Sequence, residues 1–507
     1  MKSILSIIML GLALTATAKN EVYQTANDGS VTSFEDLAKI EGSGVTKEGD
    51  NTYVIVKDIE VLANDGITLA NNTTLKLAKD VIIKMFGKNF NFAPADTALI
   101  TNTEEGVKPK GLWFTETDGY INVKHIRFEY AGVRIAGPAG AIIENCTFFE
   151  HNASMDKSAI SINGSSVGTE IRKCTFIRSA RAAIATGSNI AAGKIIEDCV
   201  FEQCCTDNRN YPVINEVPSG NNGEVIIRRN KIYGGKFNMS GAISVSNMLG
   251  VIGANKVLIE DNYMDNCRYG MNLWGQMVDF RVINNTIINC HYETNANNGG
   301  SGIAINCANK EPEKASKLYI EGNTIEGCLW GITNMGNASP NIGKVDDVFA
   351  DDYNPGNNVF RNNGNCEKAP AGAENAFDPS IPYDLYNHTP MTVYAQGNLW
   401  GGADQSAAEI AKRIVDAADD SAFGEVIYLP AADPAAIQQI SADSDISVDV
   451  IGNGSFSING VADHAAVQVY DIAGKLLFNG SANGTISVGT KGLVIIVVDG
   501  QAYRILL

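Results

Sequence analysis

A short phrase recurs seven times through the middle of this chain. In each copy an apolar residue is followed three places later by a Cys or an Asn, which we call the anchor, and a second apolar residue stands two places beyond it. The anchors are Cys146, Cys174, Cys199, Asn230, Asn262, Asn285 and Asn323. Their mean spacing of 29.5 residues is typical of solenoids, in which each repeat packs against its neighbours. The spacing varies from 23 to 38 residues, which predicts loops of unequal length between recurring strands.

Each repeat also contains a second apolar segment opened by a small residue, such as Gly241-Ala242-Ile243-Ser244-Val245. Alternation with a period of two is typical of strands that bury one face and turn the other outward. The regular leucine frame of leucine-rich repeats is absent from the sequence. We therefore predict an all-β fold, a right-handed single-stranded parallel β-helix, rather than a propeller.

The anchors predict columns of inward-facing side chains. Stacked Asn side chains pass an amide hydrogen bond from coil to coil, which satisfies polar groups that are costly to bury. A buried Cys fills the same tight turn as a small apolar group. A second column, five places after the anchor, contains Cys204, Cys267, Cys290 and Cys328. Because parallel side chains in a column favour packing, we expect reduced thiols in place of disulfides.

Two places before the anchor the charges alternate in sign, as in Glu144, Arg172, Glu197, Arg228 and Glu260. Outward-facing pairs of this kind on neighbouring strands stabilise a sheet by about 0.2–1 kcal/mol each. We interpret the strip as a solvated stabilising face and assign it no chemistry.

Both ends of the repeat region resemble a family of secreted right-handed β-helix proteins, the pectate-lyase-like superfamily. The resemblance covers roughly residues 50–432 and is carried by segments 65–69, 74–77, 110–114, 123–126 and 396–402. The last of these, Gln396-Gly397-Asn398-Leu399-Trp400-Gly401-Gly402, resembles the turn that closes many such solenoids. The family resemblance implies a β-helix over residues 51–432, with a closing helix at 406–418. A leader or cap at 19–50 is expected to precede the β-helix. The resemblance specifies a fold and hardly any activity.

Residues 433–507 are expected to form a small C-terminal β-sandwich. Two strand patterns in it, residues 467–476 and 491–498, are similar to the C-terminal sorting domains of the type IX secretion system of Gram-negative bacteria. That resemblance implies export across the outer membrane, sometimes surface attachment, and the secretion machinery as a partner. A plain accessory sandwich is the alternative.

The first eighteen residues have the pattern of a secretory signal peptide. Lys2 precedes the apolar stretch Ile4–Leu14, and Ala16-Thr17-Ala18 matches the small-x-small cleavage site. Cleavage before Lys19 is expected, and no later segment is apolar for long enough to span a membrane. The expected location is secreted or on the outer-membrane surface of a Gram-negative bacterium.

The charge balance excludes one class of partner. The chain has 57 acidic and 39 basic residues, a formal net charge of −18. Binding to nucleic acid through a general field needs clustered Lys and Arg to neutralise phosphates, so we do not expect a nucleic-acid partner.

Three basic residues stand six places after successive anchors, namely Lys236, Arg268 and His291. With Glu293 nearby, they form a candidate catalytic group that could hold an acidic sugar and abstract an α-proton, and Asp207 is a candidate substrate-binding residue beside them. An ordinary solvated row is the alternative interpretation.

One place further on stand the aromatic residues Phe237, Tyr269, Tyr292 and Trp330. If Tyr292 and Trp330 are exposed, they line a substrate-binding groove for glycans. The alternative is that these rings stack in the core and contribute only packing. Asp346, Asp347, Asp351 and Asp352 are weak candidates for a Ca²⁺ site, and no other cofactor is expected. The sequence contains no HExxH motif.

These patterns lead to three hypotheses of function. The first is an exported or cell-surface β-helix protein that binds complex carbohydrate, a polysaccharide or cell-surface glycan, through one lateral face. The second is a polysaccharide lyase or glycosidase acting on acidic glycans with Lys236, Arg268, His291 and Glu293. The third is a structural or adhesive surface protein.

Overall fold

The computed structural model describes residues 21–432 except 89, 116–118, 153–157, 165–167, 189, 308–310, 312–313 and 403. Beyond them it describes residues 447–452, 454–461, 465–471, 475–481, 484–489, 493–498 and 501–506. The chain divides into two compact units, Met1–Ala432 and Asp433–Leu507. The expected signal peptide, residues 1–18, lies outside the described residues. No described helix is long and apolar enough to cross a membrane.

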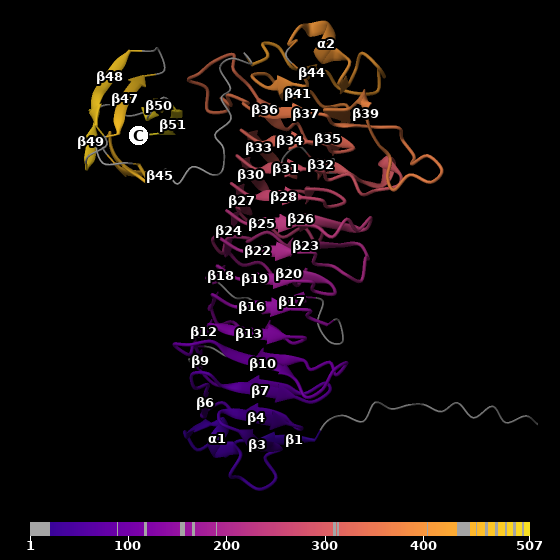
Figure 1. Ribbon diagram of the computed structural model, residues 1–507. Coiled ribbons are helices and arrows are strands. Elements are labelled where there is room, and N and C mark those ends of the chain that lie inside the picture. The colour runs from indigo at the N-terminus through magenta and orange to yellow at the C-terminus, as the bar shows by residue number, and fades with distance from the viewer. Residues whose placement is uncertain are drawn as a thin grey trace, which may run out of the picture. The chain divides into compact units, whose positions relative to one another are not determined.

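Three long sheets run the length of the first unit (Figure 1). Sheet 1 contains, in spatial order, β1 (Val22–Gln24), β5 (Asp58–Val61), β8 (Ile82–Met85), β11 (Gly111–Phe114), β14 (Gly132–Ile135), β17 (Ser158–Ile162), β20 (Ala182–Thr186), β23 (Tyr211–Glu216), β26 (Ser240–Asn247), β29 (Met271–Gly275), β32 (Ser301–Cys307), β35 (Trp330–Gly336), β40 (Leu385–His388) and β43 (Ile414–Val415). All its neighbouring strands pair in parallel, as in β26 with β29 and β29 with β32.

Sheet 2 contains β3 (Val45–Gly49), β4 (Thr52–Ile55), β7 (Thr74–Leu77), β10 (Ala98–Asn102), β13 (Ile126–Glu129), β16 (Thr147–Phe149), β19 (Thr175–Ile177), β22 (Val200–Glu202), β25 (Lys231–Tyr233), β28 (Tyr263–Asp265), β31 (Thr286–Ile288), β34 (Thr324–Glu326), β37 (Val359–Arg361) and β42 (Leu399–Trp400). Sheet 3 contains β9 (Phe90–Phe92), β12 (Ile121–Lys124), β15 (Ala141–Glu144), β18 (Thr169–Arg172), β21 (Lys194–Glu197), β24 (Glu224–Arg228), β27 (Lys256–Glu260), β30 (Asp279–Ile283), β33 (Lys317–Glu321), β36 (Asn341–Gly343), β41 (Val393–Ala395) and β44 (Val426–Ile427). Within these two sheets only β3 and β4 pair antiparallel.

One coil of the solenoid visits the three sheets in turn. The chain passes from β27 in sheet 3 to β28 in sheet 2 and on to β29 in sheet 1. A two-residue turn separates the first two strands. Its first residue, Asp261, has the left-handed φ of +53°, and its second, Asn262, is the buried anchor. Parallel strands joined in this way bury a continuous core, which confirms the predicted β-helix.

The predicted Asn column is confirmed. The amide Nδ2 of Asn230 donates to Oδ1 of Asn262 at 2.9 Å, Asn262 donates to Asn285, and Asn285 donates to Asn323, each at the same distance. The ladder continues to Asn358 and Asn398. All ten cysteines are unpaired, as expected, and nine are buried. A third inward column stacks Phe128, Phe148, Phe176 and Phe201 with ring centroids 4.8–4.9 Å apart.

The N-terminal end is closed by short elements. β1 adds to the edge of sheet 1, and β2 (Val31–Ser33) pairs with β6 (Gly66–Thr68). Helix α1 (Phe34–Leu37) follows, and Ser33 and Asp36 form a capping box at its start. These elements give the first coil a cover over an edge that would otherwise expose unpaired backbone groups.

The closing helix is shorter than expected. Helix α2 spans only Ala407–Ala411, and Ile414–Val415 form β43, the last strand of sheet 1. The prediction of a helix over 406–418 is therefore wrong beyond residue 411. The carbonyl of Arg413 accepts the backbone N–H groups of Asp384 and Leu385, and the β-branched pair that follows extends the sheet.

The second unit contains two antiparallel sheets. One consists of β45 (Ser447–Gly452), β46 (Ser455–Asn459) and β49 (Thr485–Ser487), and the other of β48 (Leu476–Ser481), β47 (Ala466–Asp471), β50 (Leu493–Val498) and β51 (Gln501–Leu506). Phe456 and Ile486 from the first sheet and Val467, Val469 and Ile496 from the second belong to one buried cluster. A small all-β domain thus follows the β-helix.

Candidate functional site

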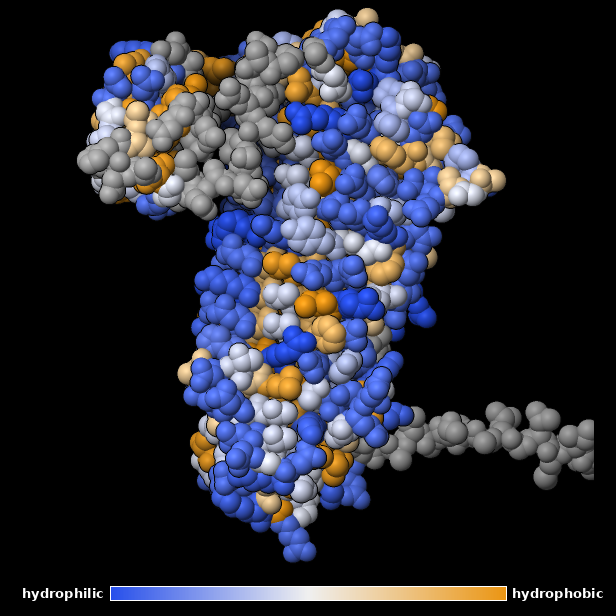
Figure 2. All heavy atoms as spheres, viewed as in Figure 1, coloured by the Kyte–Doolittle hydropathy of each residue, from blue (hydrophilic) through white to orange (hydrophobic). Residues whose placement is uncertain are grey.

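The outward face of sheet 2 presents one side chain per coil in a regular row. Strand pairing aligns one outward residue from each coil, three places after the anchor, into a row. The row consists of Phe149, Ile177, Glu202, Tyr233, Asp265, Ile288 and Glu326. White, tan and orange spheres run along this face between blue borders (Figure 2). The face therefore offers apolar and aromatic surface that is not taken up by the core.

An open pocket of about 740 Å³ lies at the edge of this row. We call it the lateral pocket. Its lining comes from the ends of β19, β22 and β25, from the turns that follow them and from the turn after β28. The lining residues are Ile177, Arg178, Glu202, Gln203, Tyr233, Gly234, Gly235, Lys236, Phe237 and Asn266. The lining combines two aromatic rings, two cations, a carboxylate and two side-chain amides, which is a set of groups suited to a polar ligand.

Two glycines shape the turn that carries Lys236. A Cβ at Gly234 would lie 2.2 Å from the carbonyl oxygen of Asn266, and one at Gly235 would lie 2.3 Å from the ring of Phe237. Lys236 itself has a left-handed φ of +59°, and its N–H donates to the Asn266 carbonyl at 3.2 Å. The close approach of the next coil thus requires glycine at 234, and the ring of Phe237 in the same turn requires it at 235.

Tyr233 is the exposed ring of the pocket, with 39% of its surface accessible. Its ring centroid lies 5.6 Å from that of Tyr263 on the next strand, at an interplanar angle of 51°. Burial raises the pKa of Tyr263 above its ordinary value. Arg178 is exposed and its Nε donates to Glu150 at 3.1 Å.

Of the basic residues selected from the sequence, Lys236 is exposed and lines the lateral pocket. Its ammonium Nζ lies 5.8 Å from the centroid of the Tyr292 ring. Tyr292 is only 9% exposed, and its hydroxyl donates to Oδ1 of Asn266 at 3.1 Å. Tyr292 therefore packs against two pocket residues without lining the pocket, and it is not an open platform.

Arg268 and Glu293 form a largely enclosed ion pair. Nε of Arg268 donates to the Glu293 carboxylate at 2.7 Å, and the two side chains are 12% and 7% exposed. The guanidinium also donates to Oδ1 of Asn210 at 3.0 Å and to the backbone carbonyl of Asn298. Since the N–H of Thr294 donates to the other carboxylate oxygen, both candidate catalytic groups are held by the protein itself.

The remaining sugar-site candidates lie apart from the pocket lining. His291 stacks on Phe377 at 4.5 Å, and its Nδ1 lies within hydrogen-bond distance of the Gly327 carbonyl oxygen. Trp330 is 8% exposed and donates its Nε1–H to the carbonyl of Ala296 at 2.9 Å. An exposed aromatic groove through Trp330 is therefore wrong, because this ring packs in a satellite cluster beneath two loops.

Two acidic candidates have partners of their own. Asp207 lies 3.6 Å from the guanidinium of Arg181. In the suggested Ca²⁺ group, Asp352 pairs with Lys344, Asp346 accepts from Gln396 and Asp347 accepts from the N–H of Phe349. Among the described residues, Asp351 and these three carboxylates do not come together with each other or with His or Cys in a group that could hold a metal ion.

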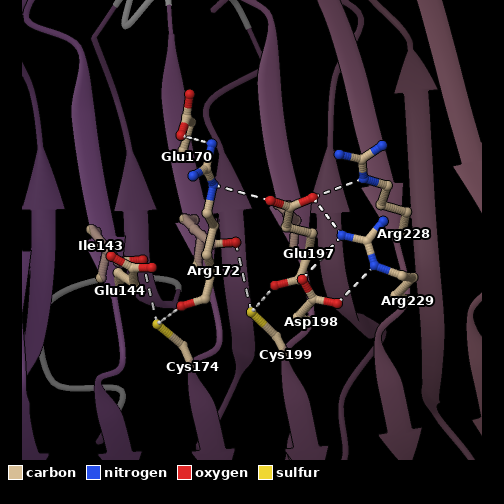
Figure 3. A network of polar contacts seen from close by, with 12 residues as sticks. Ile143, Glu144, Glu170, Arg172, Cys174, Glu197, Asp198, Cys199, Arg228 and Arg229 are labelled. Carbon is tan, nitrogen blue, oxygen red and sulfur yellow. Dashed lines mark hydrogen bonds and ion pairs between the residues drawn. The ribbon is translucent and has the colours of Figure 1, made fainter. Parts of the chain in front are cut away.

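The alternating charges on sheet 3 form the expected ion-pair strip (Figure 3). The Glu197 carboxylate lies 3.0 Å from Arg172, 2.8 Å from Arg228 and 2.9 Å from Arg229. Burial alone would raise the pKa of Glu197, but the neighbouring guanidinium groups outweigh it and hold that pKa below its ordinary value. With every close charge compensated, the strip links successive coils and offers no reactive group.

The pocket ring Tyr233 was not among the residues selected from the sequence. A signal for it existed. The apolar residue two places after each anchor points inward. By strand alternation, the residue three places after the anchor therefore points outward. Reading that column gives Phe149, Ile177 and Tyr233, an unusual set of large side chains for an outward face.

Comparison with known proteins bears on the fold. Residues 110–287 match the family model described as a right handed beta helix region. The chain matches no curated protein sequence. Crystal structures of the periplasmic alginate epimerase AlgG and of a mutant of it are similar in backbone, with TM-scores of 0.36 and 0.38 and 13% and 12% sequence identity. Each alignment covers 79% of this chain and 83% of the other. The family match and the three parallel sheets together show that the first unit is a right-handed parallel β-helix.

Proposed function

We propose that this protein binds complex carbohydrate along the outward face of sheet 2, with the lateral pocket as the principal contact. The observation that carries the proposal is the position of the exposed ring of Tyr233 in an open pocket beside Lys236, Gln203 and Asn266. An aromatic ring packs against the C–H face of a sugar, and the surrounding amides and ammonium bind its oxygens.

The repeating geometry of the face favours a polymer over a single sugar. Neighbouring coils are about 4.8 Å apart, so one row presents a regular series of contacts along the solenoid. Phe149 and Ile177 lie in the same row beyond Glu202 on one side of Tyr233, and Ile288 lies beyond Asp265 on the other. A linear glycan lying along the row would touch several coils at once.

The test is oligosaccharide binding by a matched pair of tyrosine variants. We expect Tyr233→Ala to weaken binding at least tenfold, since aromatic anchors of a site often account for more than about 1.4 kcal/mol. Tyr120→Ala is the control, because Tyr120 is 44% exposed and precedes β12 in sheet 3. Calorimetry with a polyuronate hexasaccharide and a neutral glucan hexasaccharide provides the measurement. Equal binding by both variants, or no binding by the unchanged protein, contradicts the proposal.

The same incubations separate binding from cleavage. A lyase acting on the polyuronate leaves unsaturated chain ends, which appear as new ultraviolet absorbance. We expect none, with or without added Ca²⁺, because Arg268 and Glu293 are bound to each other and to neighbouring protein groups. Product formation would replace a binding function by an enzymatic one.

We infer that the chain is exported, on the basis of its signal-peptide pattern and the resemblance of residues 433–507 to sorting domains. Mass spectrometry of the exported protein is expected to find Lys19 as the first residue. Deletion of 433–507 is expected to retain the β-helix in the periplasm if the C-terminal unit is a sorting signal, and to leave its location unchanged if the unit is an accessory sandwich.

A further inference from the structure

We propose that Tyr292 is a positioning residue for the lateral pocket, which holds the ammonium of Lys236 and the amide of Asn266 in place together. This inference rests on the proposed function, since it concerns the same pocket. The three residues come from three successive coils, whose anchors are Asn230, Asn262 and Asn285. One buried ring therefore connects two pocket residues to a coil that does not itself line the pocket.

Two different contacts of Tyr292 reach the pocket. The face of its ring lies 5.8 Å from Nζ of Lys236, within the range of a cation–π interaction. Its hydroxyl donates to Oδ1 of Asn266 at 3.1 Å. The backbone closes the triangle, because the N–H of Lys236 donates to the Asn266 carbonyl at 3.2 Å.

These contacts decide which groups the pocket presents. Since the amide oxygen of Asn266 faces the Tyr292 hydroxyl, its NH₂ group is turned the other way. The ring face attracts the ammonium of a long, flexible and otherwise exposed lysine, which limits the rotamers it samples. The pocket then offers N–H donors from two side chains, which complement hydroxyl or carboxylate oxygens of a sugar.

Tyr292 can act in this way because its own backbone is held firmly. The next residue, Glu293, binds Arg268 through its side chain and accepts the N–H of Ala376 at its carbonyl, at 3.1 Å. The side chain of Tyr292 contacts Asn266 and Lys236, while that of Glu293 binds Arg268. The loop that follows β31 is thus pinned on both sides of Tyr292.

Two substitutions separate the two contacts. Tyr292→Phe removes the hydrogen bond to Asn266 and keeps the ring under Lys236, whereas Tyr292→Leu removes both. We expect Tyr292→Leu to weaken binding of the oligosaccharide probe about two- to fivefold, and Tyr292→Phe to weaken it less. A merely structural tyrosine would lower the melting temperature without a graded effect on affinity, so both quantities are measured for each variant.

A second readout does not depend on binding. Reductive ¹³C-methylation of the lysines gives an NMR signal for Lys236, assigned with Lys236→Arg. The Tyr292 ring current is expected to shift this signal upfield in the unchanged protein and in Tyr292→Phe, but not in Tyr292→Leu. An unshifted signal in the unchanged protein overturns the positioning role. If Tyr233→Ala abolishes binding while both Tyr292 variants bind normally, the pocket stands and only this inference fails; if the unchanged protein binds no probe, the proposed function fails.

Discussion

At the scale of single residues, His151 makes the stability of this protein sensitive to acid. Its side chain is 4% exposed, and burial, helped by Arg181, lowers its pKa to about 3. An unfolded histidine titrates near pH 6.5, so the folded state resists a proton that the unfolded state accepts. Stability is therefore full above about pH 6.5 and is lost progressively as the pH falls toward 3.

The expected loss attributable to His151 is about 2–3 kcal/mol between pH 7 and pH 4.5. Urea unfolding at both pH values measures it. Leucine does not titrate, so in His151→Leu the free energy of unfolding is expected to fall less between the two pH values, by that amount, whatever the stability of the variant at pH 7. A variant with the same pH dependence as the unchanged protein contradicts the assignment.

The pair Lys194 and Glu216 is a second residue-scale feature, because both charges lie inside the β-helix. Their side chains are 1% and 0% exposed, with Nζ 3.3 Å from the carboxylate. Thr186 donates to the same oxygen at 2.7 Å, while the other oxygen, Oε1, has no hydrogen-bond partner among the described residues. Removal of one charge leaves the other buried and uncompensated.

Glu216→Leu alone is expected to lower the free energy of unfolding by about 3–5 kcal/mol. The double variant Lys194→Met with Glu216→Leu is expected to recover most of that loss, because two apolar groups of similar volume need no partner. Chemical denaturation of the unchanged protein, the two single variants and the double variant gives the interaction free energy between the two charges. Additive losses would mean that the two charges do not stabilise each other.

At the scale of elements, the anchor column was predictable, because strand period and repeat spacing fix which side chains face the axis. The same reasoning predicted the ion-pair strip on sheet 3 and the unpaired thiols. It failed where loops decide the environment. Trp330 packs against the loop after β31 and the segment between β38 (Gly364–Asn365) and β39 (Phe377–Pro382), which meet through Asn295 and Lys368, and this contact has no repeat to reveal it.

The junction between the Cys and Asn parts of the anchor column gives a test of the ladder. Asn230 accepts the N–H of Cys199 at 3.0 Å and donates to Asn262. Asn230→Cys extends the Cys column by one coil, so it removes hydrogen bonds at the end of the ladder only. Asn285→Cys interrupts the ladder between Asn262 and Asn323.

We expect Asn285→Cys to be the more destabilising of the two, by about 1–3 kcal/mol, since it leaves buried amide groups unsatisfied on both sides. Thermal unfolding of both variants measures the difference. Equal losses would show that each Asn acts alone in its own turn and that the ladder has no collective character.

At the scale of the whole molecule, the inward thiol columns report how the solenoid opens. Nine cysteines are buried, from Cys146 in an early coil to Cys328 in a late one, and Cys366 alone is partly exposed. Burial raises the pKa of Cys146 and of Cys328, which suppresses the reactive thiolate. Contacts within each unit of a solenoid join neighbouring coils only, so opening could spread from one end or involve all coils together.

Ellman's reagent separates these two modes. One thiol is expected to react quickly in the native protein and to disappear in Cys366→Ser, while nine react only when the β-helix opens. If the solenoid unfolds as one cooperative unit, these nine share a single rate that follows the global unfolding rate. If it unravels from an end, mass spectrometry of the labelled protein will find either Cys146 or Cys328 modified first. Fast reaction of the column thiols without unfolding would contradict the close-packed axis on which the stacked coils depend.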